Sequence, residues 1–144
     1  MKRIEQYLEG LMVVDANLDD YEPLINEFHL DELSIRLFST GEDALRASAV
    51  SSSMLWIVNI RLPDISGLTF LQLVRRRMRR SSVFLVGNGY SAIDELAARS
   101  AGATAYVCKP ASAAWLKGYR RLARSPAIHS PLNLSGAAVA MRPP

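Results

Sequence analysis

The sequence contains few of the residues that build disulfide scaffolds, metal centres or membrane spans. It has one cysteine, Cys108, and its two histidines, His29 and His129, stand alone without metal-ligand spacing. A single cysteine excludes an intramolecular disulfide framework and is typical of a reducing compartment. No apolar run approaches the roughly 18 residues of a membrane span, and the N-terminus, MKRIEQYLEG, lacks a signal-peptide apolar segment. We therefore expect a cytoplasmic protein with no membrane partner.

The charges are unevenly distributed along a chain of otherwise ordinary composition. The 144 residues are 49% apolar and 22% charged, which is typical of one globular domain. Residues 1–70 carry 5 basic and 12 acidic groups, a net −7, whereas residues 71–144 carry 12 basic and 2 acidic groups, a net +10. The second half is suited to an acidic partner, although charges that only decorate solvated helix faces would give the same counts.

Short apolar runs alternate regularly with amphipathic stretches. The runs predict five strands, at Leu11–Asp15, Leu33–Phe38, Leu55–Val58, Val83–Val86 and Thr104–Cys108. Helical spacing predicts a helix after each strand; one of these is capped by Ser91 and carries Ile93 and Leu96. This alternation predicts a parallel sheet with helices on both faces. Residues 1–124 then form one domain, and residues 125–144, with four prolines and no periodicity, form a C-terminal tail.

Polar residues follow the predicted strands at the edge where open parallel sheets bind ligands. They are Asp15 with Ala16, Asn59 with Arg61, Gly87 and its neighbour Asn88, and Lys109. The segments around them, VVDA, NIRLPDISG, LVGNG and AGATAYVCKP, resemble the signature segments of the response-regulator receiver domain. The resemblance extends over about residues 10–124. It implies a flavodoxin-like (CheY-like) three-layer α/β sandwich with strand order 2-1-3-4-5, in which a histidine kinase transfers a phosphoryl group to an aspartate.

The resemblance assigns the family's functional positions to residues of this chain. Asn59 falls at the phospho-acceptor aspartate. Asp15 and Ala16 fall at the adjacent acidic pair, so that one acid of the pair is left. Gly87 falls at the serine or threonine that follows the fourth strand. The acceptor, the acidic pair and the hydroxyl are thus all altered.

The fifth strand and the helix after it supply the other family positions. Lys109 matches the family's lysine, with a cis peptide implied before Pro110, and Tyr106 matches the switch aromatic. The resemblance also implies a partner-docking face, which here would carry Tyr106, Trp115 and Arg120. Helical periodicity equally allows Trp115 to belong to the core, and both placements stay open.

The chemistry of these residues argues against phosphoryl transfer. The carboxamide of Asn59 is not a nucleophile as a carboxylate is, and Gly87 has no hydroxyl to bond a phosphoryl oxygen. Magnesium prefers one or two carboxylates beside the phosphate, and Asp15 with the carbonyl of Arg61 would hold it weakly at best. We expect Lys109 to pair with Asp15, and the cationic side chain of Arg61 to reach the pocket.

These considerations predict a stand-alone degenerate receiver, not an enzyme, that acts as a phosphorylation-independent protein-interaction module. Its partner would be a histidine kinase, another signalling protein or a second copy in a homodimer. One alternative keeps phosphotransfer, with Asp19 or Asp20 supplying a missing acid. The other is a basic nucleic-acid-associated protein that binds phosphates through the run Arg75–Arg80. We expect no nucleic-acid partner, because arginines at a helix C-terminus also complement the helix dipole.

Overall fold

The structure is a computed structural model that describes residues 11–27, 35–49, 55–79 and 81–123, with side chains in the last range up to Gly118. Its elements in chain order are β1 (Leu11–Val14), the 3-10 helix η1 (Leu18–Tyr21), α2 (Glu22–Glu27), β2 (Ile35–Phe38), α3 (Gly41–Ser48), β3 (Leu55–Asn59), α4 (Gly67–Arg77), β4 (Ser82–Gly87), α5 (Ala92–Ser100), β5 (Ala105–Cys108) and α6 (Ala113–Ala123). The expected tail at residues 125–144 lies outside the described residues.

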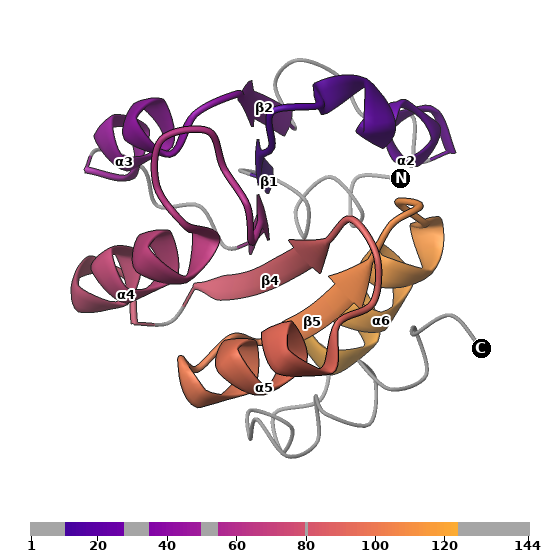
Figure 1. The fold of residues 1–144 in the computed structure, drawn as a ribbon. Coiled ribbons are helices and arrows are strands. Elements are labelled where there is room, and N and C mark those ends of the chain that lie inside the picture. Colours follow the sequence, from indigo (N-terminus) through magenta and orange to yellow (C-terminus); the bar gives the residue numbers. More distant parts are fainter. Residues whose placement is uncertain (1–10, 28–34, 50–54, 80, 124–144) are drawn as a thin grey trace.

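The five strands form one parallel sheet in the order β2-β1-β3-β4-β5, which confirms the predicted topology (Figure 1). The register pairs Val14 with Val58, and Asn59 with Val86. The residues that follow these strands therefore meet at one edge of the sheet, as strand-end ligand sites require. Strands β1, β3, β4 and β5 are buried on both faces and are almost continuously apolar, whereas the edge strand β2 has Arg36 and Leu37 exposed.

Helices cover both faces of the sheet and enclose two apolar cores. One core, on the side of η1, α2 and α6, contains Tyr21, Leu24 and Trp115. The other, on the side of α3, α4 and α5, is centred on Trp56 and Phe70, whose rings lie 5.4 Å apart. Alternate residues of each strand point into the two cores, which gives the three-layer sandwich expected from the sequence. Among the described residues, no helix combines the length and the apolar character that a membrane span requires.

The local sequence explains where α3, α4 and α5 begin. Thr40, Ser66 and Ser91 are the N-caps of α3, α4 and α5, and each side-chain oxygen accepts hydrogen bonds from backbone N–H groups of the first turn. The first predicted helix is divided, because a 3-10 turn precedes α2 and Pro23 lies in the first turn of α2. This turn brings the Tyr21 hydroxyl to the carboxylate of Asp15 at the sheet edge.

Helix α5 has its largest apolar side chains on the solvent side. Ile93 is 81% exposed and Leu96 is 67% exposed, although the sequence places them at helical spacing. The buried positions of α5 are Glu95 and Ala98. Glu95 is accommodated because its carboxylate accepts a hydrogen bond from Tyr90 and pairs with Arg99 at 3.1 Å.

Candidate functional site

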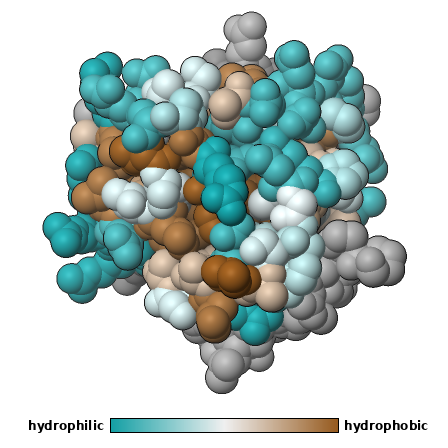
Figure 2. Space-filling view, viewed as in Figure 1, coloured by the Kyte–Doolittle hydropathy of each residue, from teal (hydrophilic) through white to brown (hydrophobic). Residues whose placement is uncertain are grey.

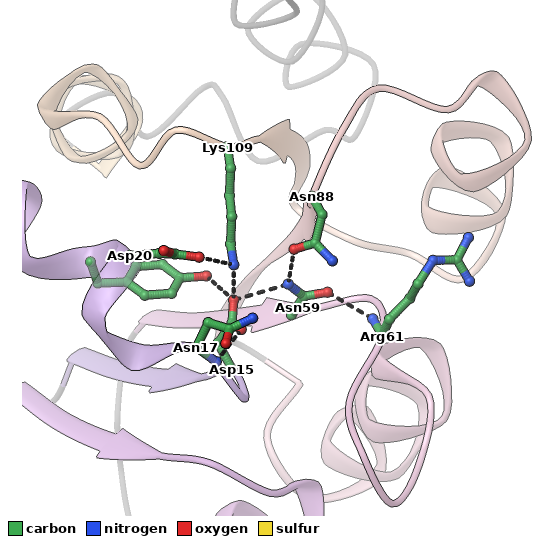
Figure 3. Close-up of polar contacts among 8 residues, drawn as sticks. Asp15, Asn17, Asp20, Asn59, Arg61, Asn88 and Lys109 are labelled. Atoms are coloured by element: carbon green, nitrogen blue, oxygen red, sulfur yellow. Dashed lines mark hydrogen bonds and ion pairs between the residues drawn. The ribbon is translucent and has the colours of Figure 1, made fainter.

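The candidate site lies at the carboxyl edge of the sheet, where three strand-end residues meet (Figure 3). Asp15 follows β1, Asn59 ends β3 and Lys109 follows β5. Asp15 and Asn59 are each 1% exposed, and the side chain of Lys109 is 11% exposed. The chain can turn closely after Asn59 because Gly67 is a glycine, and a Cβ there would overlap the carbonyl oxygen of Asn59.

Asp15 is the central acceptor of the site. Its Oδ2 accepts hydrogen bonds from the Tyr21 hydroxyl at 2.8 Å and from Nδ2 of Asn59 at 2.9 Å, and it lies 2.9 Å from Nζ of Lys109. Its Oδ1 accepts from the backbone N–H of Asn17 at 2.9 Å. Both carboxylate oxygens are therefore occupied by donors of the protein itself.

Lys109 lies between two carboxylates. Its Nζ is 2.9 Å from Oδ2 of Asp15, as the sequence predicts, and 2.7 Å from Oδ2 of Asp20. The ammonium also lies 5.6 Å from the centre of the Tyr21 ring, within the range of a cation–π contact. Asp20 thus belongs to the site through Lys109. The peptide bond between Lys109 and Pro110 is cis, as the family resemblance implies.

Asn59 uses both ends of its amide in the same network. Its Nδ2 donates to Asp15 and also to Oδ1 of Asn88 at 2.9 Å, and its Oδ1 accepts from the backbone N–H of Arg61 at 2.8 Å. A carboxylate has no N–H to donate, so an amide suits this position and an ionised acid does not. The expectation for the Arg61 side chain was wrong: it is 70% exposed, points away from the pocket and pairs with Asp94 at 3.2 Å.

These contacts shift the pKa values of the buried groups. Burial alone would raise the pKa of Asp15, but hydrogen bonds from the Asn17 backbone and from Asn59, Lys109 and Tyr21 hold that pKa below its usual value. Burial would lower the pKa of Lys109, but the two carboxylates at Asp20 and Asp15 raise it. Burial beside Asp15 raises the pKa of the Tyr21 hydroxyl, which stays protonated as a donor. The site is a closed set of charged and hydrogen-bonded partners at neutral pH.

Gly87 makes room for the hydroxyl group of Tyr106. A Cβ at Gly87 would lie 2.5 Å from the Tyr106 hydroxyl oxygen and 2.8 Å from the carbonyl oxygen of Gly89. That hydroxyl accepts a hydrogen bond from the Ser91 backbone N–H at 3.3 Å and donates to the Gly89 carbonyl at 3.4 Å. Tyr106 therefore holds the segment that leads into α5, and glycine at position 87 is a steric condition for this placement.

The partner face expected from the sequence needs correction. Tyr106 is 1% exposed and Trp115 is 2% exposed, so neither ring is presented to a partner. Trp115 packs against Tyr21 in the core, with ring centroids 6.5 Å apart. The side chain of Arg120 lies outside the described residues. The exposed apolar residues of this part of the molecule lie instead on α5.

A family model for the response regulator receiver domain matches residues 6–119 of the chain. The chain belongs to the response regulator receiver domain family. Receiver domains are signalling modules of two-component systems. No protein with a curated description matches the chain by sequence.

Solved structures of receivers share the fold of this chain. A CheY-like receiver domain protein from Methanospirillum hungatei JF-1 has a TM-score of 0.66 and 22% identity, over 79% of this chain and 91% of that one. The chemotaxis response regulator CheY4 of Vibrio cholerae has a TM-score of 0.67 and 18% identity, over 77% and 95%. A response regulator from Burkholderia pseudomallei, solved with a phosphorylated aspartic acid, a calcium ion and citrate, has a TM-score of 0.66 and 17% identity, over 83% and 74%.

The structure brings together most of the strand-end residues that the sequence singled out. Asn59 and Lys109 both contact Asp15, whereas Ala16 is exposed and the Arg61 side chain points outward. The sequence interpretation missed Tyr21 as a donor to Asp15. Hydrophobic periodicity predicts that the Tyr21 ring is buried in the core, but it predicts nothing about the hydrogen bond of its hydroxyl group.

Proposed function

We propose that this receiver is degenerate and acts in the cytoplasm as a phosphorylation-independent protein-interaction module, without enzyme activity of its own. The observation that carries the proposal is the role of Asn59. Asn59 stands at the position of the phospho-acceptor, where its Nδ2 donates hydrogen bonds to Asp15 and Asn88. Its carboxamide has no nucleophilic carboxylate oxygen that could accept a phosphoryl group. Ala16 and Gly87 support the same conclusion, because the Ala16 side chain has no metal-binding oxygen and Gly87 has no hydroxyl.

The alternative routes to function receive less support from the geometry. Asp20 is committed to Lys109 at 2.7 Å and is half-exposed on η1, so it is poorly placed to replace the acceptor. In the arginine run, the guanidinium of Arg75 donates to the carbonyl oxygens of Ser81 and Gly102, and to Oγ1 of Thr104 at 3.4 Å. Arg75 thus ties α4 to the strands beneath it, which leaves a shorter basic run for a nucleic-acid backbone.

We place the docking surface on α5. Ile93 and Leu96 lie one turn apart and are largely exposed, and Tyr90 beside them is 39% exposed. Figure 2 shows hydrophobic side chains at the surface in the lower centre, where Figure 1 places α5. Neighbouring exposed apolar side chains of this kind suit an apolar surface on a partner protein.

Phosphorylation assays on three proteins test the first half of the proposal. We expect acetyl phosphate with magnesium to add no phosphoryl group to the wild type or to Asn59→Asp, as measured by intact-mass spectrometry. The single variant should fail because Ala16 leaves the metal one carboxylate short and Gly87 supplies no hydroxyl. The double variant Asn59→Asp with Ala16→Asp should accept some phosphoryl groups. A base-labile phosphoryl adduct at high occupancy on the wild type would refute the proposal, and equal labelling of both variants would show that Ala16 is not limiting.

A pull-down from native cytosol tests the second half. The bait is protein that has never met a phosphodonor, and the comparison is Ile93→Asp with Leu96→Asp against Ala92→Asp, an exposed position on the same helix. We expect one set of proteins to be retained by the wild type and by the Ala92 control and to be lost with the double variant. Retention of the same proteins by all three baits would place docking elsewhere, and sedimentation of the purified chain reports self-association on this surface.

A further inference from the structure

A cation is already built into the strand-end site. The Lys109 ammonium lies 2.9 Å from the buried carboxylate of Asp15 and 2.7 Å from the half-exposed carboxylate of Asp20, and the lysine side chain is 11% exposed. The face of Tyr21 lies below it at 5.6 Å. Figure 3 shows the lysine side chain extended along its full length toward the two acids.

We propose that the ammonium group of Lys109 is the resident cation of this site and keeps divalent cations out of it. The inference deepens the proposed function, because a receiver that admits no magnesium lacks the metal on which phosphoryl transfer in the family depends. It rests, however, on different atoms from those that make Asn59 unreactive. The two ideas can therefore fail separately.

The side-chain oxygen atoms of Asp15 and Asn59, which magnesium would need, already have donors. Magnesium takes six oxygen ligands in near-ideal octahedral geometry and gives up its water reluctantly. Oδ2 of Asp15 already contacts three donors and Oδ1 contacts the Asn17 N–H. Asn59 turns its N–H group toward Asp15, and its Oδ1 is bonded to the Arg61 backbone. Within the described ranges, no group of three or more His, Cys, Asp or Glu residues is arranged to hold a metal.

Entry of a metal would therefore require Lys109 to leave. The displaced ammonium would lose both carboxylates and the ring face, and Tyr21 and Asn59 would compete with the metal for the same oxygen of Asp15. If the ammonium is the obstacle, then its removal should open the site. Lys109→Met keeps an unbranched side chain of similar length and leaves two carboxylates without their cation. This variant should gain a site for magnesium or calcium that the wild type lacks.

Lysine reactivity tests the inference in the unmodified protein. The chain has three lysines, Lys2, Lys109 and Lys117, which mass spectrometry resolves after reductive methylation. We expect Lys109 to be methylated far more slowly than the exposed Lys117, and millimolar magnesium to leave its rate unchanged. An increase in Lys109 methylation on addition of magnesium would show that the metal displaces the ammonium and would overturn the inference.

Thermal unfolding of variants provides the second measurement. Lys109→Met should unfold several degrees below the wild type and regain part of this loss in millimolar magnesium or calcium, because a ligand that binds only the folded state stabilises it. Wild type and the control Lys117→Met should be unaffected by either metal. Stabilisation of the wild type by magnesium, or no response of a folded Lys109→Met, would refute the inference; if this variant does not fold, the methylation result decides. A wild type that binds magnesium and still accepts no phosphoryl group would refute this inference and leave the proposed function standing.

Discussion

The strand-end site and the outer face of α5 differ in whether their side chains have partners within the molecule. At the site, four side chains with polar or charged groups, Asp15, Tyr21, Asn59 and Lys109, are buried or nearly so and all find partners within the molecule. On α5, Ile93 and Leu96 are apolar and lie in water. The polar groups of the strand-end site are thus paired within the molecule, whereas α5 leaves apolar side chains exposed to solvent.

From this contrast we infer that the strand-end network has a structural role and that the exposed face of α5 is the surface available to a partner. A closed polar network in a low-dielectric environment fixes one arrangement of the elements that contribute to it. Asn59 bonds Asn88, and Arg61 bonds Asp94, so that the segment before α5 and its first turn are tied to β3 and the loop after it. The network thereby fixes the position of the first turn of α5 relative to the sheet. Mutations that act on one region and spare the other test this interpretation.

The largest effect is expected for Asp15→Ala. The change leaves the Lys109 ammonium and the donors of Tyr21 and Asn59 without their common acceptor. Breaking a buried charge pair in this way costs about 3–5 kcal/mol of unfolding free energy. Urea unfolding measures it, with Asp19→Ala as the control, since Asp19 is exposed in the same segment and should change stability by no more than ~0.5 kcal/mol. Equal effects of the two substitutions would contradict a central role for Asp15.

Gly87→Ala should have the next largest effect. The new Cβ would lie 2.5 Å from the Tyr106 hydroxyl oxygen, and we expect a loss of about 1–3 kcal/mol as the ring is pushed out. Gly89→Ala is the matched control, because a Cβ there meets nothing within 4 Å, and it should be neutral or stabilising by ~0.4–1 kcal/mol. Spectrophotometric titration adds a second readout. Burial raises the pKa of Tyr106 in the wild type, and this pKa should fall in Gly87→Ala only.

The pH dependence of stability should show both ends of the Asp15–Lys109 pair. The pKa of Asp15 lies below its ordinary 3.8, so its contribution is present above pH 3.8 and is lost as the pH falls through the folded-state pKa. The pKa of Lys109 lies above its ordinary 10.5, so its contribution is present below pH 10.5 and is lost as the pH rises through the folded-state pKa. The free-energy gap between wild type and Asp15→Asn should therefore be widest between these limits. Urea unfolding at roughly equal pH steps from about pH 2 to 12 measures this gap. A gap that does not change with pH would exclude the Asp15–Lys109 pair as its cause.

The smallest effect on stability is expected on α5. Ile93→Ser with Leu96→Ser removes side chains that are already in water, and the unfolding free energy should change by no more than ~0.5 kcal/mol. Leu71→Ala, which truncates a fully buried side chain of α4, should cost about 2–5 kcal/mol in the same assay. A large loss in the α5 variant would mean that Ile93 and Leu96 belong to the fold and not to a docking surface.

The sequence predicts the sheet and the main residues of the site because strand patterns and strand ends are local properties. Each apolar run specifies a strand, and the parallel topology then places Asp15, Asn59 and Lys109 at one edge. The direction of a side chain beyond that edge is not a local property. Arg61 extends to Asp94, which is 33 residues away in the chain, and Asn88 reaches Asn59 across two strand ends.

The orientation of α5 shows the same limit for a helix. A spacing of three between Ile93 and Leu96 specifies a common face, but it does not say whether that face points inward or outward. The buried face of α5 contains Glu95, a residue type that a sequence pattern predicts to be exposed. Its carboxylate is buried because Tyr90 and Arg99 satisfy it, and these partners are recognisable only in the folded arrangement.

The strand order also separates the acidic residues of the first half of the sequence from the basic residues of the second half. Among the described side chains, residues 11–70, which supply β2, β1 and β3, carry 3 basic and 8 acidic groups, and residues 71–118, which supply β4 and β5, carry 7 basic and 2 acidic groups. The acidic half thus lies toward the β2 edge of the sheet and the basic half toward the β5 edge. Charges separated in this way give the described part of the domain an electric dipole moment along the sheet, which a net charge alone does not reveal. In an electric field, or above a charged surface, the molecule therefore takes a preferred orientation, with its β5 edge directed toward negative charge.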